Sequence, residues 1–379
     1  MSSCLECGTL SVMTLPSGYF MKAAVFHGPN MPMTIEDVQL DGLKPREIRI
    51  QTQFAGICHS DLHFVEGIFP FRAPAVLGHE SAGIVADVGC DVEYVKPGDH
   101  VITCLSVFCG HCNHCLSGYP NRCGGRATAR KKGEKSRLSM NGEPVAQFAH
   151  LSSYAEELLV HENAVVKIRE DMPLDRAALI GCGVTTGVGA VLRTAKVEAG
   201  STVAVIGCGG IGLSTINGAS IAGAGRIIAI DRLDSKLELA RQFGATDLVN
   251  ASDGDSVEQV IELTSGGVDY SFEAIGLKQT SEDAWNMLTT GGTATVIGMI
   301  PAGQNIEIPG TDLLQEKKLQ GSMMGSNRFR IDMPRYVDFY LSGKLKLDPL
   351  ISSRIPLSQI NEGMETLKKG EVARQIVTF

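Results

Sequence analysis

The segment Ser201-Thr-Val-Ala-Val-Ile-Gly-Cys-Gly-Gly-Ile-Gly212 joins a short valine-rich strand pattern to the spacing Gly-x-Gly-x-x-Gly. A helical pattern follows from Leu213 to Ala222, and a second strand pattern, residues 226–230, ends at Asp231. Glycines at these positions let the backbone turn tightly and approach a pyrophosphate, whose charge the N-terminus of the helix stabilises. The order of strand, turn, helix and strand therefore predicts a dinucleotide-binding turn rather than a glycine-rich packing turn.

The residues predicted to contact the dinucleotide lie in this turn and at the end of the second strand. Asp231 stands 19 residues beyond Gly212, the spacing expected of a carboxylate that accepts hydrogen bonds from ribose hydroxyls. Such a carboxylate would repel a 2'-phosphate and so favours NAD over NADP, although the adjacent arginine could accommodate that phosphate. The predicted contacts are Gly207, Gly209, Gly210, Ile211, Gly212, Asp231 and Arg232.

Around this turn, the chain predicts two kinds of unit. Strand patterns at 203–206, 227–230, 268–272 and 295–297 alternate with helical patterns at 233–243 and 256–264, as in a doubly wound parallel sheet. From Met21 to Leu105, short strands alternate with turn signals, which indicates a barrel-like β unit. We therefore expect an α/β fold, with a cofactor domain at 186–324 inserted into a catalytic domain formed by residues 1–185 and 325–379.

The composition excludes several classes of protein. With 379 residues, 44% hydrophobic residues and a net charge of -8, the chain is typical of a globular protein without a nucleic-acid or membrane-surface partner. The uncharged stretch 201–225 is long enough to cross a bilayer, but its seven glycines and its strand pattern favour a buried strand, turn and helix. The first twenty residues contain no Lys or Arg, so we expect no export signal and a cytoplasmic location. The pair Cys4-x-x-Cys7 is too isolated to predict a metal site.

A cluster of four cysteines predicts a structural zinc site. The chain has eleven cysteines, which are expected to be thiols or metal ligands because the cytosol keeps thiols reduced. Within residues 109–123, here called the cysteine lobe, the spacing Cys-x-x-Cys-x-x-Cys is followed after seven residues by a fourth cysteine, which matches a closed Cys4 site. An iron–sulfur cluster or free surface thiols are the alternatives. The predicted ligands are Cys109, Cys112, Cys115 and Cys123.

A second candidate metal site, here called the dispersed cluster, is spread along the chain. It comprises Cys58 in Cys-His-Ser-Asp61, His79 in Gly-His-Glu80, and Cys182 between two glycines. Taken singly, each residue is more often a packed core residue than a ligand. Together, two cysteines and one histidine match an open zinc site that leaves a fourth position for water or substrate.

With these motifs in the family's order, the chain resembles the zinc-dependent medium-chain alcohol dehydrogenases from about Met21 to Phe379. The resemblance implies a GroES-like catalytic domain, a Rossmann cofactor domain, an active site in the cleft between them, and dimers or tetramers. It implies that Cys58, His79 and Cys182 bind a catalytic zinc ion, that the cysteine lobe binds a structural zinc ion, and that the cofactor is NAD.

The resemblance also implies roles for four residues near the catalytic zinc. Asp61 would hold the imidazole of His79, which fixes its tautomer and raises its basicity as a ligand. Glu80 would approach the metal transiently. Ser60 and His63 would pass the alcohol proton to solvent.

For the cofactor, the resemblance implies that Lys236 contacts the adenosine ribose and that Arg374 contacts the pyrophosphate. Thr186 and His59 would be further contacts, although some members have arginine in place of His59, and a neutral imidazole would bind phosphate less firmly.

Two other departures from the family concern the substrate pocket. Leu105 stands where several members have an aromatic residue, and Ser60 is smaller than the threonine of some relatives. Both changes predict a roomy apolar pocket, with Phe69 and Phe148 as further wall residues.

We therefore predict zinc- and NAD-dependent interconversion of alcohols with aldehydes or ketones, and favour bulky apolar, aryl or allylic substrates that are primary or secondary alcohols. The alternative is a formaldehyde dehydrogenase acting on a glutathione-type thiol adduct, because a basic segment could receive an anionic adduct, although such segments are more often solvated loops. A nicotinoprotein that retains its cofactor and a non-catalytic zinc-stabilised scaffold are further alternatives. The basic residues are Arg126, Arg130, Lys131, Lys132, Lys135 and Arg137.

Overall fold

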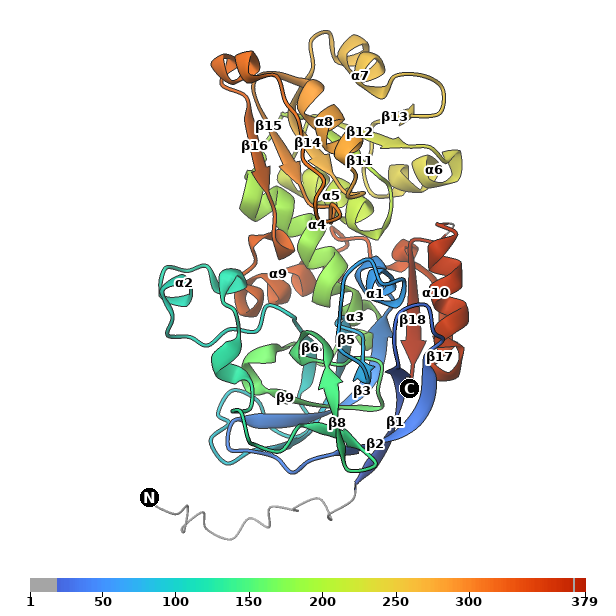
Figure 1. Cartoon of the computed structure of the whole chain (residues 1–379). Helices are drawn as coiled ribbons and strands as arrows, with labels where there is room; N and C mark the ends of the chain where they lie inside the picture. The colour runs from blue at the N-terminus through green and yellow to red at the C-terminus, as the bar shows by residue number, and fades with distance from the viewer. Residues whose placement is uncertain (1–18, 371) are drawn as a thin grey trace.

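The computed structural model describes residues 19–370 and 372–379. A β-rich part that contains the first and last strands lies below a part built on a parallel sheet (Figure 1). This combination confirms the predicted α/β fold class. Residues 1–18, on which the prediction of no export signal and the Cys4-x-x-Cys7 pair depend, lie outside the described residues.

The β-rich part consists of a closed barrel and a seven-stranded sheet. The barrel has the strand order β1, β2, β7, β8, β4, and the sheet has the order β10, β6, β5, β3, β18, β17, with β9 paired to β3. Strand β18, at the end of the chain, runs antiparallel to β3 with Ile376 opposite Gly56. The last strand therefore lies in the same part as the first described strand. The bounds are β1 (Phe20–Phe26), β2 (Thr34–Leu40), β3 (Glu47–Gly56), β4 (Ala75–Val76), β5 (Ser81–Val88), β6 (His100–Thr103), β7 (Leu138–Met140), β8 (Glu143–Gln147), β9 (Glu157–His161), β10 (Val165–Lys167), β17 (Ile351–Pro356) and β18 (Arg374–Thr378).

The other part is a six-stranded parallel sheet in the order β13, β12, β11, β14, β15, β16. This order reverses between β11 and β14, which is the switch point at which doubly wound sheets bind dinucleotides. Helix α5 begins at Gly210, before the predicted start at Leu213, because the last glycines of the turn already belong to the helix. The bounds are β11 (Thr202–Ile206), β12 (Arg226–Asp231), β13 (Asp247–Asn250), β14 (Val268–Glu273), β15 (Leu288–Val296), β16 (Lys318–Gly321), α5 (Gly210–Ala222), α6 (Asp234–Gln242), α7 (Ser256–Thr264) and α8 (Lys278–Asn286).

A continuous helical run from Leu174 to Ala195 passes between the two parts. It comprises α3 (Leu174–Leu179), the π-helical turn η5 (Ile180–Val184), α4 (Thr185–Gly189) and the π-helical turn η6 (Ala190–Ala195). A Cβ at Gly187 would lie 2.5 Å from the carbonyl oxygen of Ile211, and a Cβ at Gly181 would lie 2.9 Å from that of Thr103. The run therefore contacts α5 and β6 through its main chain. The predicted domain boundary at 185–186 falls inside the run and stays a prediction.

This run is also the one helix among residues 19–370 and 372–379 that is long and apolar enough to cross a membrane. Of its apolar window, 83% is buried inside the structure, as expected of a core helix. The stretch 201–225 instead forms β11 and α5, which confirms the predicted strand, turn and helix.

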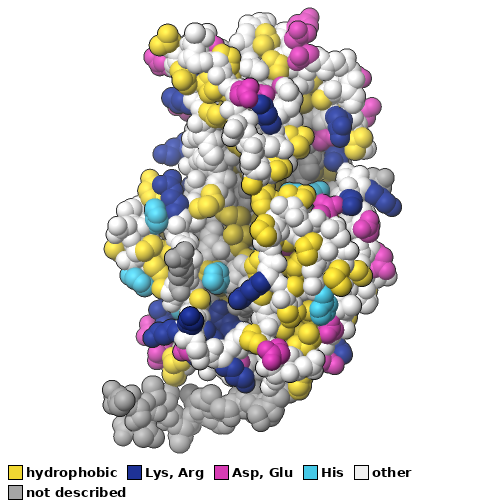
Figure 2. Space-filling model, in the orientation of Figure 1, with side chains coloured by type: hydrophobic (Ala, Val, Ile, Leu, Met, Phe, Trp, Pro, Cys, Tyr) yellow, Lys and Arg dark blue, Asp and Glu magenta, His cyan; other side chains and the backbone are white. Residues whose placement is uncertain are grey.

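The remaining helices cover the β-rich part. Helices α1 and α10 lie side by side near the parallel-sheet part, whereas α2 belongs to the cysteine lobe, which projects from the side of the molecule (Figure 1). Acidic and basic side chains are interspersed over the visible face, as expected of a surface without a single-sign field (Figure 2). The bounds are α1 (His59–Val65), α2 (Asn113–Leu116), α9 (Phe329–Leu341) and α10 (Ile360–Lys368).

Candidate active site

The three residues of the dispersed cluster meet in the interior. Cys58 immediately precedes α1, His79 lies between β4 and β5, and Cys182 lies in the π-helical turn η5. Their ligand atoms lie within 4.8 Å of one another, and the residues are 2%, 1% and 5% exposed, respectively. Single π-helical turns occur frequently at functional sites. The fold thus brings together all three predicted ligands.

Hydrogen bonding around the dispersed cluster suits a zinc ion. His79 Nδ1 lies 3.1 Å from Asp61 Oδ1 and donates to it, which leaves Nε2, 3.2 Å from Cys182 Sγ, as the nitrogen directed at the metal position. A hydrogen bond between the two thiols lowers the pKa of Cys58 well below its usual value and, with burial, raises that of Cys182. One sulfur is thus already favoured as a thiolate. A zinc ion would bind both sulfurs as thiolates and retain one open tetrahedral position.

Two buried carboxyl groups beside the cluster differ in their environments. Asp61 accepts from His79 Nδ1, from Gly78 N at 3.1 Å and from Tyr154 Oη at 2.9 Å. Burial raises the pKa of Glu80 to about 7, and its Oε1 has no hydrogen-bond partner among the described residues. The contact between Asp61 and the ligand imidazole is therefore present, whereas a role for Glu80 stays a prediction.

The cysteine lobe gathers its four thiols as the spacing predicts, with their sulfurs within 4.8 Å of one another. The sulfurs of Cys109 and Cys112 lie 3.9 and 3.5 Å from that of Cys115. Sulfurs bound tetrahedrally at about 2.3 Å from one zinc ion lie about 3.8 Å apart, so the cluster fits zinc. The backbone N–H of His111 donates to Cys109 and helps to lower its pKa to about 6, which favours the thiolate.

The glycine-rich turn has the geometry that a dinucleotide needs. A Cβ at Gly212 would lie 1.7 Å from the carbonyl oxygen of Gly207, so the close packing of α5 on β11 requires glycine. A Cβ at Gly209 would meet nothing within 4 Å, which leaves open space beside the N-terminus of α5. The backbone N–H groups of this turn are placed to bind an anion.

Arg374 places a cation beside the same turn. A Cβ at Gly210 would lie 2.7 Å from its Cζ, and a Cβ at Gly183, next to Cys182, would lie 2.6 Å from its Nη2. The residue is 4% exposed, and Nη2 has no hydrogen-bond partner in the described part of the chain. An unpartnered buried donor near a helix N-terminus fits a pyrophosphate.

Further predicted cofactor residues lie near this turn. Desolvation and, to a smaller degree, the charges of Arg374 and Lys236 lower the pKa of His59, although the residue is exposed at the surface. Asp231 ends β12, where its Oδ2 accepts from Cys208 N and its Oδ1 from Arg232 N, each at 2.8 Å. These bonds orient the carboxylate at the switch point, where a ribose would lie.

The two predicted relay residues lie on α1 close to the dispersed cluster. Ser60 Oγ donates to Met299 Sδ at 3.5 Å and lies 3.8 Å from Cys58 Sγ. His63 Nδ1 is buried and has no hydrogen-bond partner among the residues that the structure describes. Ser60 is thus held beside the metal ligands by a sulfur from the parallel-sheet part.

An aromatic cluster borders the site. Two of its rings were predicted as wall residues: Phe148 lies 5.9 Å from the His79 ring, and Phe69 lies 5.7 Å from the His63 ring. Leu105 packs instead in a separate apolar cluster of the seven-stranded sheet, and its role as a wall residue stays a prediction. The aromatic cluster consists of Phe64, Phe69, Phe71 and Phe148, with ring contacts of 4.8 to 6.0 Å.

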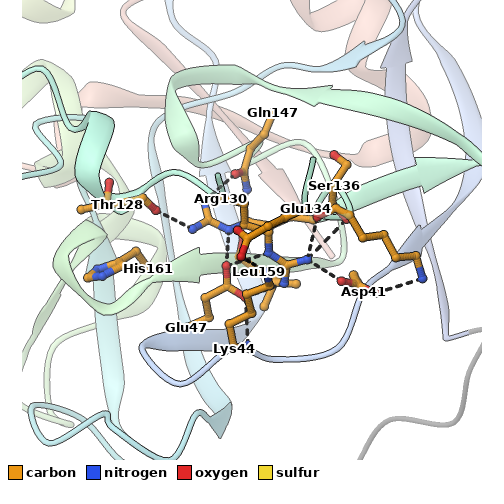
Figure 3. A network of polar contacts seen from close by, with 12 residues as sticks. Asp41, Lys44, Glu47, Thr128, Arg130, Glu134, Ser136, Gln147, Leu159 and His161 are labelled. Atoms are coloured by element: carbon orange, nitrogen blue, oxygen red, sulfur yellow. Dashed lines mark hydrogen bonds and ion pairs between the residues drawn. The ribbon is translucent and has the colours of Figure 1, made fainter. Parts of the chain in front are cut away.

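The basic segment 126–137 is organised around a buried carboxylate (Figure 3). Arg130 Nε and Arg137 Nε donate to Glu47 Oε1 at 3.0 and 2.7 Å, and Arg130 also pairs with Asp41. The side chains of Arg130 and Arg137 are 7% and 6% exposed. These two arginines are therefore neither solvated nor presented to a ligand, because Glu47 and Asp41 already compensate their charge. The exposed Lys131 and Lys132 remain at the surface.

Several residues of the site carried no sequence signal. Tyr154 reaches Asp61 across 93 residues of chain. Met324 Sδ lies 4.0 Å from Cys182 Sγ and accepts from the predicted cofactor residue Thr186 at 3.4 Å. Isolated tyrosine and methionine residues belong to no spacing motif, so only the fold identifies them.

Comparisons with known proteins agree with this geometry. A family model described as a zinc-binding dehydrogenase matches residues 210–342, and one described as an alcohol dehydrogenase GroES-like domain matches residues 44–170. A class-3 alcohol dehydrogenase from Oryza sativa subsp. japonica is 41% identical over 370 residues, covering 94% of this chain and 96% of that protein. An S-(hydroxymethyl)glutathione dehydrogenase from Saccharomyces cerevisiae is 40% identical over 367 residues, covering 94% and 95%. The structure of benzyl alcohol dehydrogenase from Acinetobacter calcoaceticus matches with a TM-score of 0.89 at 30% identity, covering 95% and 99%.

The chain therefore belongs to the zinc-dependent medium-chain alcohol dehydrogenase family. It is an oxidoreductase, and the dispersed cluster and the cysteine lobe are its zinc-binding sites. Membership confirms the predicted GroES-like and Rossmann units and implies alcohol or aldehyde substrates.

Proposed function

We propose that this enzyme transfers a hydride between an alcohol and NAD at the dispersed cluster. The observation that carries the proposal is an open set of three zinc ligands connected to an anion-binding turn by one residue. Arg374 lies against Gly183, which follows the ligand Cys182, and also against Gly210 at the start of α5. Metal and nucleotide would therefore lie on either side of one guanidinium group.

The chain's own residues would bind the substrate and move the proton. A zinc ion held by the dispersed cluster would act as a Lewis acid toward the substrate oxygen. Ser60, 3.8 Å from Cys58 Sγ, would accept the alcohol proton while it gives up its own hydroxyl proton, and His63 would pass a proton on to solvent. Phe148, packed on the His79 ring, excludes water from this side of the site.

The cofactor contacts follow from the charges around the turn. Asp231 and Lys236 bind the adenosine ribose, and Arg374 binds the pyrophosphate together with the N-terminus of α5. His59 and Thr186 complete the cofactor contacts. The carboxylate of Asp231 favours NAD over NADP by repelling a 2'-phosphate.

For the substrate, the relatives support the thiol-adduct alternative better than the bulky alcohols that the sequence favoured. The yeast relative, 40% identical over nearly its whole length, is named for S-(hydroxymethyl)glutathione. We therefore place the hydroxymethyl adduct of glutathione first among the candidate substrates. Because Arg130 and Arg137 are paired with Glu47, the adduct's carboxylates would have to be met by exposed basic residues of the segment such as Lys131 and Lys132.

Bulky aromatic alcohols are the second candidate, supported by the aromatic cluster. Phe64 and Phe71 lie 4.8 and 5.2 Å from Phe148, so the side of the site next to His79 is apolar. A structural relative at 30% identity is a benzyl alcohol dehydrogenase.

Initial rates distinguish these substrates. NAD reduction with formaldehyde that requires added glutathione would support the adduct, and a higher kcat/KM for benzyl or cinnamyl alcohol would support the aromatic alternative. A preparation with two zinc ions per chain that reduces NAD with neither substrate contradicts the proposed function. Nucleotide recovered after denaturing the freshly purified protein would identify a nicotinoprotein.

We also propose that the enzyme is a cytoplasmic homodimer or homotetramer. Six of the described cysteines belong to the two zinc-binding clusters, which suits a reducing compartment that keeps thiols available as metal ligands. Light scattering of the purified protein tests the oligomeric state, and fractionation of the source cells tests the location.

A further inference from the structure

We propose that Tyr154 is a positioning residue of the catalytic zinc centre, which slows the loss of zinc by holding Asp61 against His79. The inference deepens the proposed function and rests on the dispersed cluster being a zinc site. It concerns a hydroxyl group that touches neither the metal ligands nor the nucleotide turn.

The hydroxyl of Tyr154 is directed at the one carboxylate that holds the ligand imidazole. Tyr154 is 0% exposed, and its Oη donates to Asp61 Oδ2 at 2.9 Å. The other oxygen of Asp61 accepts from His79 Nδ1 at 3.1 Å and from Gly78 N at 3.1 Å. Tyrosine, aspartate and histidine therefore form a continuous chain of hydrogen bonds that ends at the metal position.

The backbone around Tyr154 fixes the direction of this hydroxyl. Its N–H donates to the carbonyl of Leu77 at 3.1 Å, and its carbonyl accepts from Ala24 N, in the barrel strand β1, at 2.9 Å. Its ring covers Gly78, where a Cβ would lie 2.9 Å from ring carbon atoms. Gly78 has a positive φ of 87° and directly precedes His79. The ring of Tyr154 therefore packs on the residue before the ligand histidine, and its hydroxyl holds the carboxylate that binds this histidine.

The hydroxyl controls the orientation of Asp61. With Oδ2 bonded to Tyr154, rotation of the buried carboxylate would break two sets of hydrogen bonds at once, so Oδ1 stays directed at His79. Without that bond, Oδ2 is a buried acceptor that lacks one partner, and the carboxylate is free to turn toward another donor. The imidazole would then lose its fixed orientation, which weakens a metal site.

Replacement of Tyr154 by Phe removes only the hydroxyl and keeps the ring on Gly78. We expect zinc to leave the dispersed cluster about tenfold faster in Y154F, the lower end of the range for groups that orient a ligand histidine. The cysteine lobe serves as an internal reference because it binds its zinc in a different part of the chain. The whole zinc-loaded protein is exposed to a colorimetric chelator, and the two zinc ions are followed as two kinetic phases.

Tyr336 on α9 provides a matched control. It is 2% exposed, and its Oη has no hydrogen-bond partner among the described residues. Y336F therefore removes an equally buried hydroxyl that holds no ligand, and both zinc phases should keep their wild-type rates.

A double mutant tests the route through Asp61. If Tyr154 acts on the ligand through the carboxylate, D61N should accelerate zinc release, and Y154F should add little in the D61N background. The electronic spectrum of Co(II) bound at the dispersed cluster gives a second readout, which should change in Y154F and not in Y336F.

Equal rates of zinc release in Y154F and wild type would overturn the inference, as would a full tenfold effect of Y154F on top of D61N. Acceleration of the lobe phase as well would show general loosening of the fold and would also contradict it. The proposed function fails separately, namely if the wild-type protein binds fewer than two zinc ions.

Discussion

The two zinc centres solve the same binding problem in opposite ways. The cysteine lobe takes all its ligands from residues 109–123, and its cysteines are only partly buried. The dispersed cluster takes its ligands from residues 58, 79 and 182, and all three are buried. The lobe depends on local spacing, whereas the dispersed cluster depends on β3, β5 and the helical run being correctly packed.

Because of this difference, the protein around each metal ion has a different role. Four thiolates close the lobe site, so the metal there only has to hold the chain together. The dispersed cluster keeps one position open and adds a buried chain of hydrogen bonds through Asp61 and Tyr154. We therefore expect damage to the lobe to reduce stability and damage to the dispersed cluster to reduce turnover.

The largest effect is expected from Cys182→Ala. Loss of one ligand removes the Lewis acid, which contributes several kcal/mol of transition-state stabilisation, so kcat should fall at least about a thousandfold. Nucleotide binding, measured by fluorescence titration, should persist. Cys104→Ala is the matched control, since Cys104 is a fully buried thiol whose pKa burial raises to about 12. Unchanged turnover in C182A would remove the assigned role of the dispersed cluster.

Cys112→Ala should mainly lower stability and leave turnover largely intact, which is the opposite of the expectation for Cys182→Ala. Losing the lobe zinc should lower the free energy of unfolding by about 4 kcal/mol or more, the scale of effects that follow loss of a metal site. Zinc analysis should find one ion per chain, and the molecules that stay folded should keep most of their kcat. If C112A lost turnover as completely as C182A while remaining folded, the division of duties between the two centres would be wrong.

Glu47→Gln tests whether the segment after the lobe is held by zinc or by charge. Removing the carboxylate leaves the buried Arg137 without an acidic partner and Arg130 with Asp41 alone, so we expect a loss of about 3 to 5 kcal/mol with little change in zinc content. The thermal midpoint of unfolding measures this loss. Glu134→Gln removes the charge from a half-exposed pair with Lys44 and from the acceptor of Lys131 N, and it should shift the midpoint far less than Glu47→Gln.

The contribution of Glu47 should also depend on pH. Burial would raise its pKa, but the hydrogen bonds and charges of Arg130 and Arg137 outweigh burial and lower it. A carboxyl group with a lowered pKa stabilises the fold above its unfolded pKa, about 4.3, and loses that contribution as the pH falls through the folded value. The difference in midpoint between wild type and E47Q should therefore be constant near neutrality and shrink below about pH 4. A difference that grew on acidification would have the wrong sign.

The smallest effect is expected on the preference for NAD over NADP. Asp231→Asn should lower the ratio of kcat/KM for NAD to that for NADP about tenfold, close to 1.4 kcal/mol, because the repulsion of a 2'-phosphate is lost. Asp234→Asn removes the same charge from the start of α6 and should leave the ratio nearly unchanged. An equal change of this ratio in both variants would indicate a general electrostatic effect of the lost charge rather than a contact with the ribose.

The sequence predicted what local spacing or an ordered set of motifs can encode. The four lobe cysteines lie within fifteen residues, and Gly207 to Gly212 lie between a strand and a helix, so each motif carries its own structural context. The dispersed ligands could be named only because they occur in the order of a known family. Their approach to one another depends on long-range packing.

The remaining features depend on contacts between distant residues. The charge of Arg130 and Arg137 suggested a solvated or ligand-binding loop, because no pattern links them to Glu47, which lies more than 80 residues earlier. Tyr154 and Met324 are single residues whose partners are set by the fold. The helical run 174–195 also passes through the predicted boundary at 185–186, where a change in pattern had suggested a new unit.

The same helical run also fixes the distance between the β-rich part and the parallel-sheet part. It carries Cys182 and meets β6 at Gly181 and α5 at Gly187 through main-chain atoms, which have no rotamers with which to relax. In the proposed function, the separation between the catalytic metal and the nicotinamide would therefore depend on these main-chain contacts. A methyl group added at Gly187 would push the helical run away from α5 and would lengthen the proposed path of the hydride without changing any predicted catalytic side chain.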